Sequence, residues 1–323
     1  MARADLLLAL IKSGVGGDDF AFRNAAEALI AEEEAKNHAI LASQLTDALA
    51  IRKPPSSSPI LTRAEPSNGL VYERAPDRRI SDLVLPAVAR ELCMDLIEEH
   101  HRRDLLRSYG VEPRHRVLLV GPPGGGKTSL AEAIATELMV PLLTVRYEGL
   151  IGSFLGETAA RMDALFSSVR SRPCVLFFDE FDVVAKERGD THETGEIKRV
   201  VSSLLLQVDR LPSHVIVIAA TNHPELLDRA VWRRMQLRVG LPMPTRAGKT
   251  EWLSAWTQRS GASLGLAIRT VVDRLGEVSF AELEEFARDV QRRTILSGPD
   301  ADVKAVTQAL LQQWSDRANE RSG

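Results

Sequence analysis

Val117-Leu-Leu-Val-Gly-Pro-Pro-Gly-Gly-Gly-Lys127-Thr128 is the stretch of this chain that says most about its fold. Its second part, from Gly121 to Thr128, matches the pattern G-x-x-x-x-G-K-[ST]. The first part is an apolar run typical of a buried strand, and the residues after Thr128 have helical character. A strand before the pattern and a helix after it are the context that the pattern requires. The stretch therefore predicts a phosphate-binding loop.

The residue types in this loop suit the phosphates of ATP. Glycines let backbone N–H groups converge on phosphate oxygens, and a helix N-terminus adds roughly half a positive charge. Lys127 is predicted to reach the β- and γ-phosphates, and Thr128 is predicted to hold Mg²⁺. The predicted ATP phosphate site comprises Gly121, Pro122, Pro123, Gly124, Gly125, Gly126, Lys127, Thr128 and Ser129.

A second motif lies further along the chain, where the apolar run Val175–Phe178 ends in Asp179 and Glu180. Asp179 is predicted to orient Mg²⁺ through water, and Glu180 is placed to activate the attacking water as a general base. An acidic pair at a strand end is weak evidence alone. After a phosphate-binding loop, it indicates nucleotide hydrolysis.

The rest of the chain alternates between strand and helix patterns and then becomes helical. Apolar runs at 117–120, 141–145, 174–178 and 215–220 are separated by helical stretches around 128–138, 158–170 and 196–208. Such runs fit strands buried on both faces, so we predict an α/β fold with a doubly wound parallel sheet. The predicted domains are a helical module (1–51), a Pro/Ser-rich linker (52–69), an α/β nucleotide-binding domain (70–243) and an all-helical lid (244–323).

Composition narrows the function classes. The chain has 323 residues, 44% of them hydrophobic, and a net charge of −3, so neither a nucleic-acid nor a membrane partner is indicated. The apolar run from Leu6 to Ile11 is too short to cross a membrane. Cys93 and Cys174 lie in apolar runs and are predicted to be reduced core residues. We expect a soluble, cytoplasmic protein.

From about residue 80 to residue 290, the chain resembles the AAA family of AAA+ ATPases. The run Ala219-Ala-Thr-Asn222 is similar to the sensor-1 strand, whose asparagine helps to position the lytic water. Read alone, Asn222 fits a turn residue equally well. The run from Leu227 to Arg234 resembles the second region of homology, whose arginines act on the γ-phosphate of a neighbouring subunit. The resemblance thus assigns catalytic roles to Glu180, Asn222, Arg233 and Arg234.

The adjacent arginines are similar to those of the katanin and spastin branch and of small bacterial ATPases. Relatives follow the second arginine with Phe and an acid, whereas Met235 and Gln236 stand here, so which arginine is the finger stays open. At Val208-Asp209-Arg210-Leu211, relatives often carry D-G-[FL]. Arg210 replaces that glycine, so it stays open whether this segment signals between subunits.

Two further segments extend the resemblance on the adenine side. Val278-Ser-Phe-Ala-Glu282-Leu283 is similar to the S-G-A-D-[LI] segment of the family's helical lid, with Phe280 in place of glycine. Asp82-Leu-Val-Leu-Pro86 weakly resembles the family's entry segment on the adenine side.

A segment between the second strand and the next helix resembles the family's pore loop. Its pore residues are Phe154, Leu155 and Gly156, and an aromatic ring there implies grip on an extended polypeptide. The alternative interpretation makes Phe154 a core aromatic.

The resemblance implies an ATP-promoted homohexamer that remodels, unfolds or threads protein clients. The N-terminal module is similar to those of small bacterial AAA ATPases that pair with separately encoded, often subtilisin-like, serine proteases. Two other functions stay open: a nucleic-acid-linked AAA+ switch in replication or mobile-element maintenance, and a non-catalytic nucleotide-dependent scaffold. Residues 1–50 are acidic to neutral, which argues against the first, and intact Lys127, Glu180 and Asn222 argue against the second.

Overall fold

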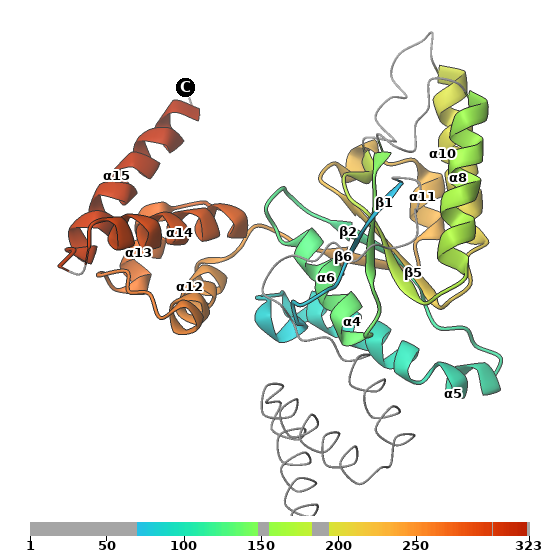
Figure 1. Cartoon of the computed structure of the whole chain (residues 1–323), viewed down its shortest axis with the longest axis horizontal. Coiled ribbons are helices and arrows are strands. Elements are labelled where there is room, and N and C mark those ends of the chain that lie inside the picture. The colour runs from blue at the N-terminus through green and yellow to red at the C-terminus, as the bar shows by residue number, and fades with distance from the viewer. Residues whose placement is uncertain (1–69, 148–154, 183–193, 299, 322–323) are drawn as a thin grey trace, which may run out of the picture. The chain divides into compact units, whose positions relative to one another are not determined.

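The computed structural model describes residues 70–147, 155–182, 194–298 and 300–321 (Figure 1). The chain divides into two units, Met1–Arg63 and Ala64–Gly323, and every described residue belongs to the second. The predicted N-terminal module and linker therefore lie outside the described residues, as does Phe154.

The centre of the described chain is a six-stranded sheet with the order β1-β3-β4-β5-β2-β6. Its pairs are parallel, except that β1 runs antiparallel to β3. The strands are β1 (Val71–Arg74), β2 (Arg116–Val120), β3 (Leu142–Val145), β4 (Cys174–Phe178), β5 (Val215–Thr221) and β6 (Leu237–Gly240). Every residue of β4 and β5 is buried, which explains their continuous apolar sequence.

The predicted α/β fold and its four central strands are confirmed, and two edge strands were missed. Strands β1 and β6 have four residues each, and their side chains alternate between more and less buried positions. Alternation over four residues gives no continuous apolar run, so the pattern that found the other strands does not find these. The missed strand β1 is the antiparallel edge of this otherwise parallel sheet.

Helices cover both faces of this sheet (Figure 1). Helices α8, α10 and α11 contribute to the apolar core on one face, and η1, α4 and α6 contribute to the core on the other. The elements are η1 (Ile80–Asp82), α4 (Ala87–His101), α5 (Arg103–Ser108), α6 (Lys127–Glu137), α8 (Leu155–Arg170), α10 (Thr194–Asp209), η2 (Pro224–Leu226) and α11 (Arg229–Arg234). Both cysteines are free and buried, Cys93 on α4 and Cys174 on β4. The sheet is doubly wound, as the sequence predicts.

Only helices follow β6 among the described residues, as the sequence predicts. They are α12 (Arg246–Ser260), α13 (Ile268–Leu275), α14 (Phe280–Leu296) and α15 (Val303–Arg321). These helices share an apolar core in which Phe286 and Trp314 meet edge to face at 5.8 Å. A capping box starts α14: Ser279 Oγ accepts from the N–H of Glu282, and Glu282 accepts from the N–H of Ser279. In the described chain, no helix is both long and apolar enough to cross a membrane.

Candidate nucleotide site

The predicted site residues meet because of the strand order. Strand β2 pairs with β5 and β5 pairs with β4, all in parallel, so their carboxyl ends lie at one edge of the sheet. The loop from Gly121 to Gly126 follows β2, Asp179 and Glu180 follow β4, and Asn222 follows β5. Two motifs that are far from the phosphate loop in sequence therefore lie beside it in the fold.

Two glycines in this loop are required by close contacts. A Cβ on Gly121 would lie 2.0 Å from the carbonyl oxygen of Leu241, and backbone atoms cannot move aside easily. Gly124 has a φ of +72°, and a Cβ there would lie 2.5 Å from Ser279 Oγ at the start of α14. The N–H of Ala281 also donates to the carbonyl of Gly124 at 3.2 Å. Gly124 therefore joins the phosphate loop directly to the helical lid.

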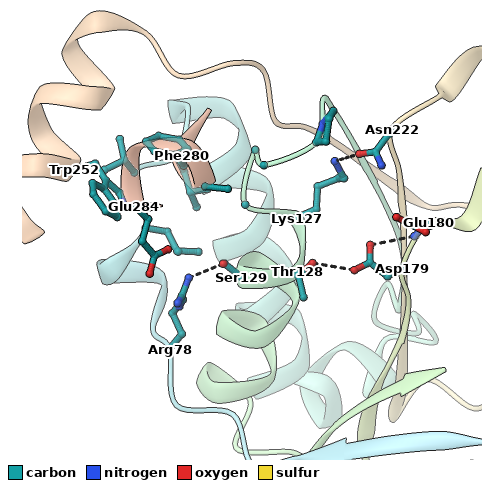
Figure 2. A pocket seen from close by; sticks show the side chains of 18 residues that line it. Arg78, Lys127, Thr128, Ser129, Asp179, Glu180, Asn222, Trp252, Phe280 and Glu284 are labelled. Atoms are coloured by element: carbon teal, nitrogen blue, oxygen red, sulfur yellow. Dashed lines mark hydrogen bonds between the residues drawn. The ribbon is translucent and has the colours of Figure 1, made fainter. Parts of the chain in front are cut away.

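The ammonium of Lys127 is held by three oxygens. It donates to the carbonyl of Gly121 at 2.7 Å, to the carbonyl of Pro122 at 2.9 Å and to Oδ1 of Asn222 at 2.6 Å (Figure 2). Burial lowers the pKa of Lys127 from its ordinary value, while the carboxylates of Asp179 and Asp182 act in the opposite direction. The contact with Asn222 joins the phosphate loop to the end of β5.

Thr128 and Asp179 offer the oxygen ligands that Mg²⁺ prefers. The Thr128 hydroxyl donates to Oδ2 of Asp179 at 3.0 Å, and Oδ1 of Asp179 accepts from the N–H of Glu180 at 3.0 Å. Glu180 has a φ of +48°, a conformation that side-chain-bearing residues rarely adopt. Such backbone conformations often occur at functional sites. Thr128 and Asp179 therefore fit a magnesium site beside the phosphate loop.

Asp182 is a site residue that sequence reasoning missed. Its buried carboxylate accepts from the Thr221 hydroxyl at 2.8 Å and from the N–H of Asn222 at 3.3 Å. The Asp182 carboxylate therefore holds the end of β5 and the residue after it, Asn222. The available signal was a second aspartate three positions after Asp179, one helical turn beyond the acidic pair.

The lid and the segment before α4 form the opposite wall of a cavity of about 330 Å³. Figure 2 shows Trp252, Phe280 and Glu284 on one side of it and Lys127 and Asn222 on the other. We name the wall formed by the lid and the segment before α4 the base wall. It consists of Arg78, Leu83, Val84, Leu85, Trp252, Phe280, Ala281 and Glu284. The phosphate wall consists of the loop from Pro123 to Ser129 with Asp179, Glu180 and Asn222.

The base wall includes side chains to which the sequence analysis gave no role. Arg78 donates from Nη1 to Ser129 Oγ at 2.5 Å and so connects the two walls. Trp252 and Glu284 come from two lid helices and belong to no local motif. For Phe280, the sequence did contain a signal, because this residue stands where relatives carry glycine. Its aromatic ring lines the cavity.

The other predicted residues lie away from this cavity or outside the described residues. Arg233 and Arg234 are on α11 and do not line it. Leu155 and Gly156 belong to the first turn of α8, which begins three residues earlier than the sequence pattern indicated. The pore-loop prediction depends on Phe154, which the structure does not describe.

Comparison with known proteins identifies similar chains. The model of the "ATPase family associated with various cellular activities (AAA)" matches residues 117–243. An "Uncharacterized AAA family ATPase y4kL" of Sinorhizobium fredii is 41% identical over 240 residues, which cover 72% of each chain. The "Peroxisomal ATPase pex6" of Schizosaccharomyces pombe is 44% identical over 134 residues, 40% of this chain and 14% of the relative. The "ATP-dependent zinc metalloprotease FtsH 3" of Sphaerobacter thermophilus is 29% identical over 256 residues, 78% of this chain and 52% of the relative.

Proposed function

The chain belongs to the AAA family of ATPases, and we propose that it forms an ATP-driven ring that remodels, unfolds or threads protein clients. It binds and hydrolyses ATP, as the family does. We propose further that the ring is a homohexamer whose assembly ATP promotes and that it works in the cytoplasm. We propose a separately encoded subtilisin-like serine protease as its partner. The reason is that the N-terminal module resembles those of small bacterial AAA ATPases that pair with such proteases.

The observation that carries the ATPase mechanism is the meeting of three strand ends at one loop. We propose that Lys127 contacts the β- and γ-phosphates, that Glu180 takes the proton of the attacking water, and that Asn222 orients this water. Thr128 and Asp179, whose oxygens are 3.0 Å apart, would hold Mg²⁺. When bound, the ion would neutralise charge on the phosphate oxygens.

Work on protein clients is supported by a relative and by a sequence segment. FtsH 3 is named as an ATP-dependent protease, so in that protein ATP is linked to a reaction on polypeptides. Phe154 stands in a segment that resembles the pore loop of such rings. An aromatic ring suits contact with many sequences, because its broad apolar face needs no specific partner.

The proposed function is tested by comparing the wild type with Phe154→Ala and Phe154→Tyr. We expect an unfolded polypeptide, such as a reduced and carboxymethylated protein, to stimulate phosphate release by the wild type. The alanine variant should retain basal hydrolysis and its melting temperature but lose this stimulation, and the tyrosine variant should retain all three. If Phe154 were a core residue instead, its replacement by Ala would destabilise the fold by about 3–5 kcal/mol.

The nucleic-acid alternative is tested in the same assay. Single- and double-stranded DNA and RNA replace the polypeptide at matched mass concentration. Stimulation by a nucleic acid, together with no response to any unfolded polypeptide, would favour the replication or mobile-element switch and overturn the remodelling proposal.

A further inference from the structure

Two side chains of opposite charge belong to the base wall of the nucleotide cavity. Arg78 comes from the segment before α4, and Glu284 comes from the second turn of α14. Figure 2 shows both on the side of the cavity where Trp252 lies, away from Lys127 and Asn222. A carboxylate repels phosphate, so Glu284 suits another part of the nucleotide. The two side chains together fit a ligand segment in which an anionic group and a hydrogen-bond donor lie close together.

The guanidinium of Arg78 keeps most of its hydrogen-bonding capacity available. It donates from Nη1 to Ser129 Oγ at 2.5 Å, and no other described residue accepts a hydrogen bond or forms an ion pair with it. A guanidinium has five N–H donors, so most of them remain for an anion. Ser129 lies on the first turn of α6, and the N-terminus of a helix attracts phosphate. Arg78 therefore offers a cation beside the phosphate loop in addition to Lys127.

The backbone that carries Arg78 is attached to the same helix. The N–H of Asp77 donates to Oε1 of Glu132 at 3.4 Å. The N–H of Ile80 donates to Oε1 of Glu137 at 3.3 Å. Both glutamates lie on α6, which begins at the phosphate loop, and Glu132 is only 5% exposed. A preorganised cation loses less freedom on binding an anion than a mobile one does, so this attachment favours binding.

The carboxylate of Glu284 has one oxygen engaged and one available. Its Oε1 accepts from Nη2 of Arg288, one turn later on α14, and no described residue donates to its Oε2. Glu284 also lies one turn after Phe280, so the two side chains share a face of the helix, and both line the cavity. An ionised carboxylate only accepts hydrogen bonds. Glu284 therefore presents an acceptor for hydroxyl or amino groups beside the aromatic ring.

A second cavity of about 300 Å³ lies next to the nucleotide cavity. Most of the residues that line only this second cavity are charged, among them Glu132 and Arg259. The residues that line both cavities form the border between them: Arg78, Leu83, Trp252 and Glu284. Burying a polar group against an apolar wall is unfavourable. The hydrophilic ribose is therefore better suited to this charged border than the base is.

The linear order of ATP decides which part of it can meet this border. The base, the ribose and the α-, β- and γ-phosphates follow one another along the molecule. With the β- and γ-phosphates at Lys127 and the base against the ring of Phe280, the ribose and the α-phosphate must span the space between them. Arg78 lines this space beside the phosphate loop, and Glu284 lines it on the lid side. An α-phosphate oxygen can thus meet the guanidinium, and a ribose hydroxyl can meet the carboxylate.

Resting on the proposed nucleotide site, we propose that Arg78 and Glu284 bind the ribose and the α-phosphate and thereby select ribonucleotides. Arg78 donates to an α-phosphate oxygen. Glu284 accepts from a ribose hydroxyl through the carboxylate oxygen that no described residue occupies. Both are binding residues and take no part in the hydrolytic step. The preferred substrates are therefore nucleotides that carry both a ribose and an α-phosphate.

The sugar contact is tested by equilibrium binding of ATP, 2′-deoxy-ATP and 3′-deoxy-ATP to the full chain. We expect the wild type to bind at least one deoxy analogue roughly 10-fold more weakly than ATP, because a charged acceptor loses its donor. Glu284→Ala should bind ATP roughly 10-fold more weakly and should bind all three nucleotides equally. Glu284→Gln, which keeps an acceptor oxygen, should retain part of the preference. The matched control is Glu285→Ala, at an exposed position next to Glu284, which should discriminate like the wild type.

The α-phosphate contact is tested by binding of adenosine, AMP and ATP. Arg78→Ala should weaken AMP and ATP by the same factor, roughly 10-fold, and leave adenosine unaffected, because only adenosine lacks the α-phosphate. Lys127→Ala should weaken ATP far more than AMP, since Lys127 reaches the later phosphates. Arg78→Lys keeps the charge but not the planar fork, so it should recover part of the affinity. The matched control is Arg79→Ala, an exposed arginine that lines neither cavity.

Ratios of affinities separate direct contact from a structural role, because a distorted site would weaken every nucleotide alike. Three results would overturn the proposal: equal affinity of the wild type for ATP and both deoxy analogues, a preference for ATP that survives in Glu284→Ala, or a loss in Arg78→Ala that extends to adenosine or spares AMP. If an alanine variant does not fold, Glu284→Gln and Arg78→Lys must shift the same ratios by smaller factors. Wild-type affinity of Lys127→Ala for ATP would instead reject the proposed nucleotide site, so the two failures are distinguishable.

Discussion

The two walls of the nucleotide cavity are built in different ways. The phosphate wall is made of loop backbone and polar side chains at the ends of three buried strands, and its glycines permit close approach. The base wall is made of large side chains from two lid helices and from the segment before α4. The first wall depends on the positions of main-chain atoms, which few substitutions can reproduce. The second depends on side-chain bulk, which many residues can supply.

The largest effect is expected at the phosphate wall, from Glu180→Gln. The change removes the proposed base and keeps the size of the side chain, so hydrolysis should fall by roughly 10²- to 10⁴-fold while ATP still binds. Phosphate release and equilibrium nucleotide binding measure the two properties separately. Glu91→Gln, at an exposed position on α4, is the control. Undiminished hydrolysis in Glu180→Gln would remove this residue from the mechanism.

The contact between the walls is tested by Gly124→Ala and Gly110→Ala. Both glycines have a left-handed φ, +72° and +74°, so both changes should destabilise the fold by about 1–2 kcal/mol. A Cβ at Gly110 meets nothing within 4 Å, whereas at Gly124 it meets Ser279 Oγ at 2.5 Å. Only Gly124→Ala should therefore displace the start of α14 and lower kcat/KM for ATP, by roughly 10- to 100-fold. Equal kinetics in the two variants would show that this contact between the walls is dispensable.

The smallest effect is expected at the base wall, from Phe280→Ala. Loss of one aromatic face should raise KM for ATP by roughly 3- to 10-fold and leave kcat nearly unchanged, because the ring lies on the wall opposite the hydrolytic residues. Steady-state kinetics with ATP and GTP would show whether the ring also contributes to the choice of base. The control is Phe280→Tyr, which keeps the aromatic face. A fall in kcat with KM constant would contradict the division between the walls.

The same contrast explains how far the sequence could predict the site. The phosphate wall follows from local patterns, since each motif has its own strand and its own polar residue at the strand end. Asp182 was missed because its role arises only when β4 and β5 lie side by side. Trp252 and Glu284 were missed because no local pattern connects the lid helices with the phosphate loop. Tertiary packing determines these contacts, and a single sequence read by local patterns does not contain it.

The arginine pair is an intermediate case. A resemblance of motifs found Arg233 and Arg234 but could not separate them, because both have the same chemistry and adjacent positions. Their difference lies in Asp209, which contacts one of them across two helix ends. Likewise, strands β1 and β6 became visible only through their pairing with β3 and β2, since their own patterns are short and alternating.

The three bonds of Lys127 have a consequence for discrimination among anions. Any anion that approaches this ammonium competes with two backbone carbonyls and the Asn222 amide, whose hydrogen bonds already satisfy its three protons. A small anion with one or two charges, such as sulfate or inorganic phosphate, replaces these bonds with little gain. A triphosphate also engages the backbone N–H groups of the loop, and its several contacts together can displace the internal acceptors. The loop is therefore expected to bind a triphosphate more tightly than sulfate or inorganic phosphate, because only the triphosphate makes enough contacts to replace all three acceptors.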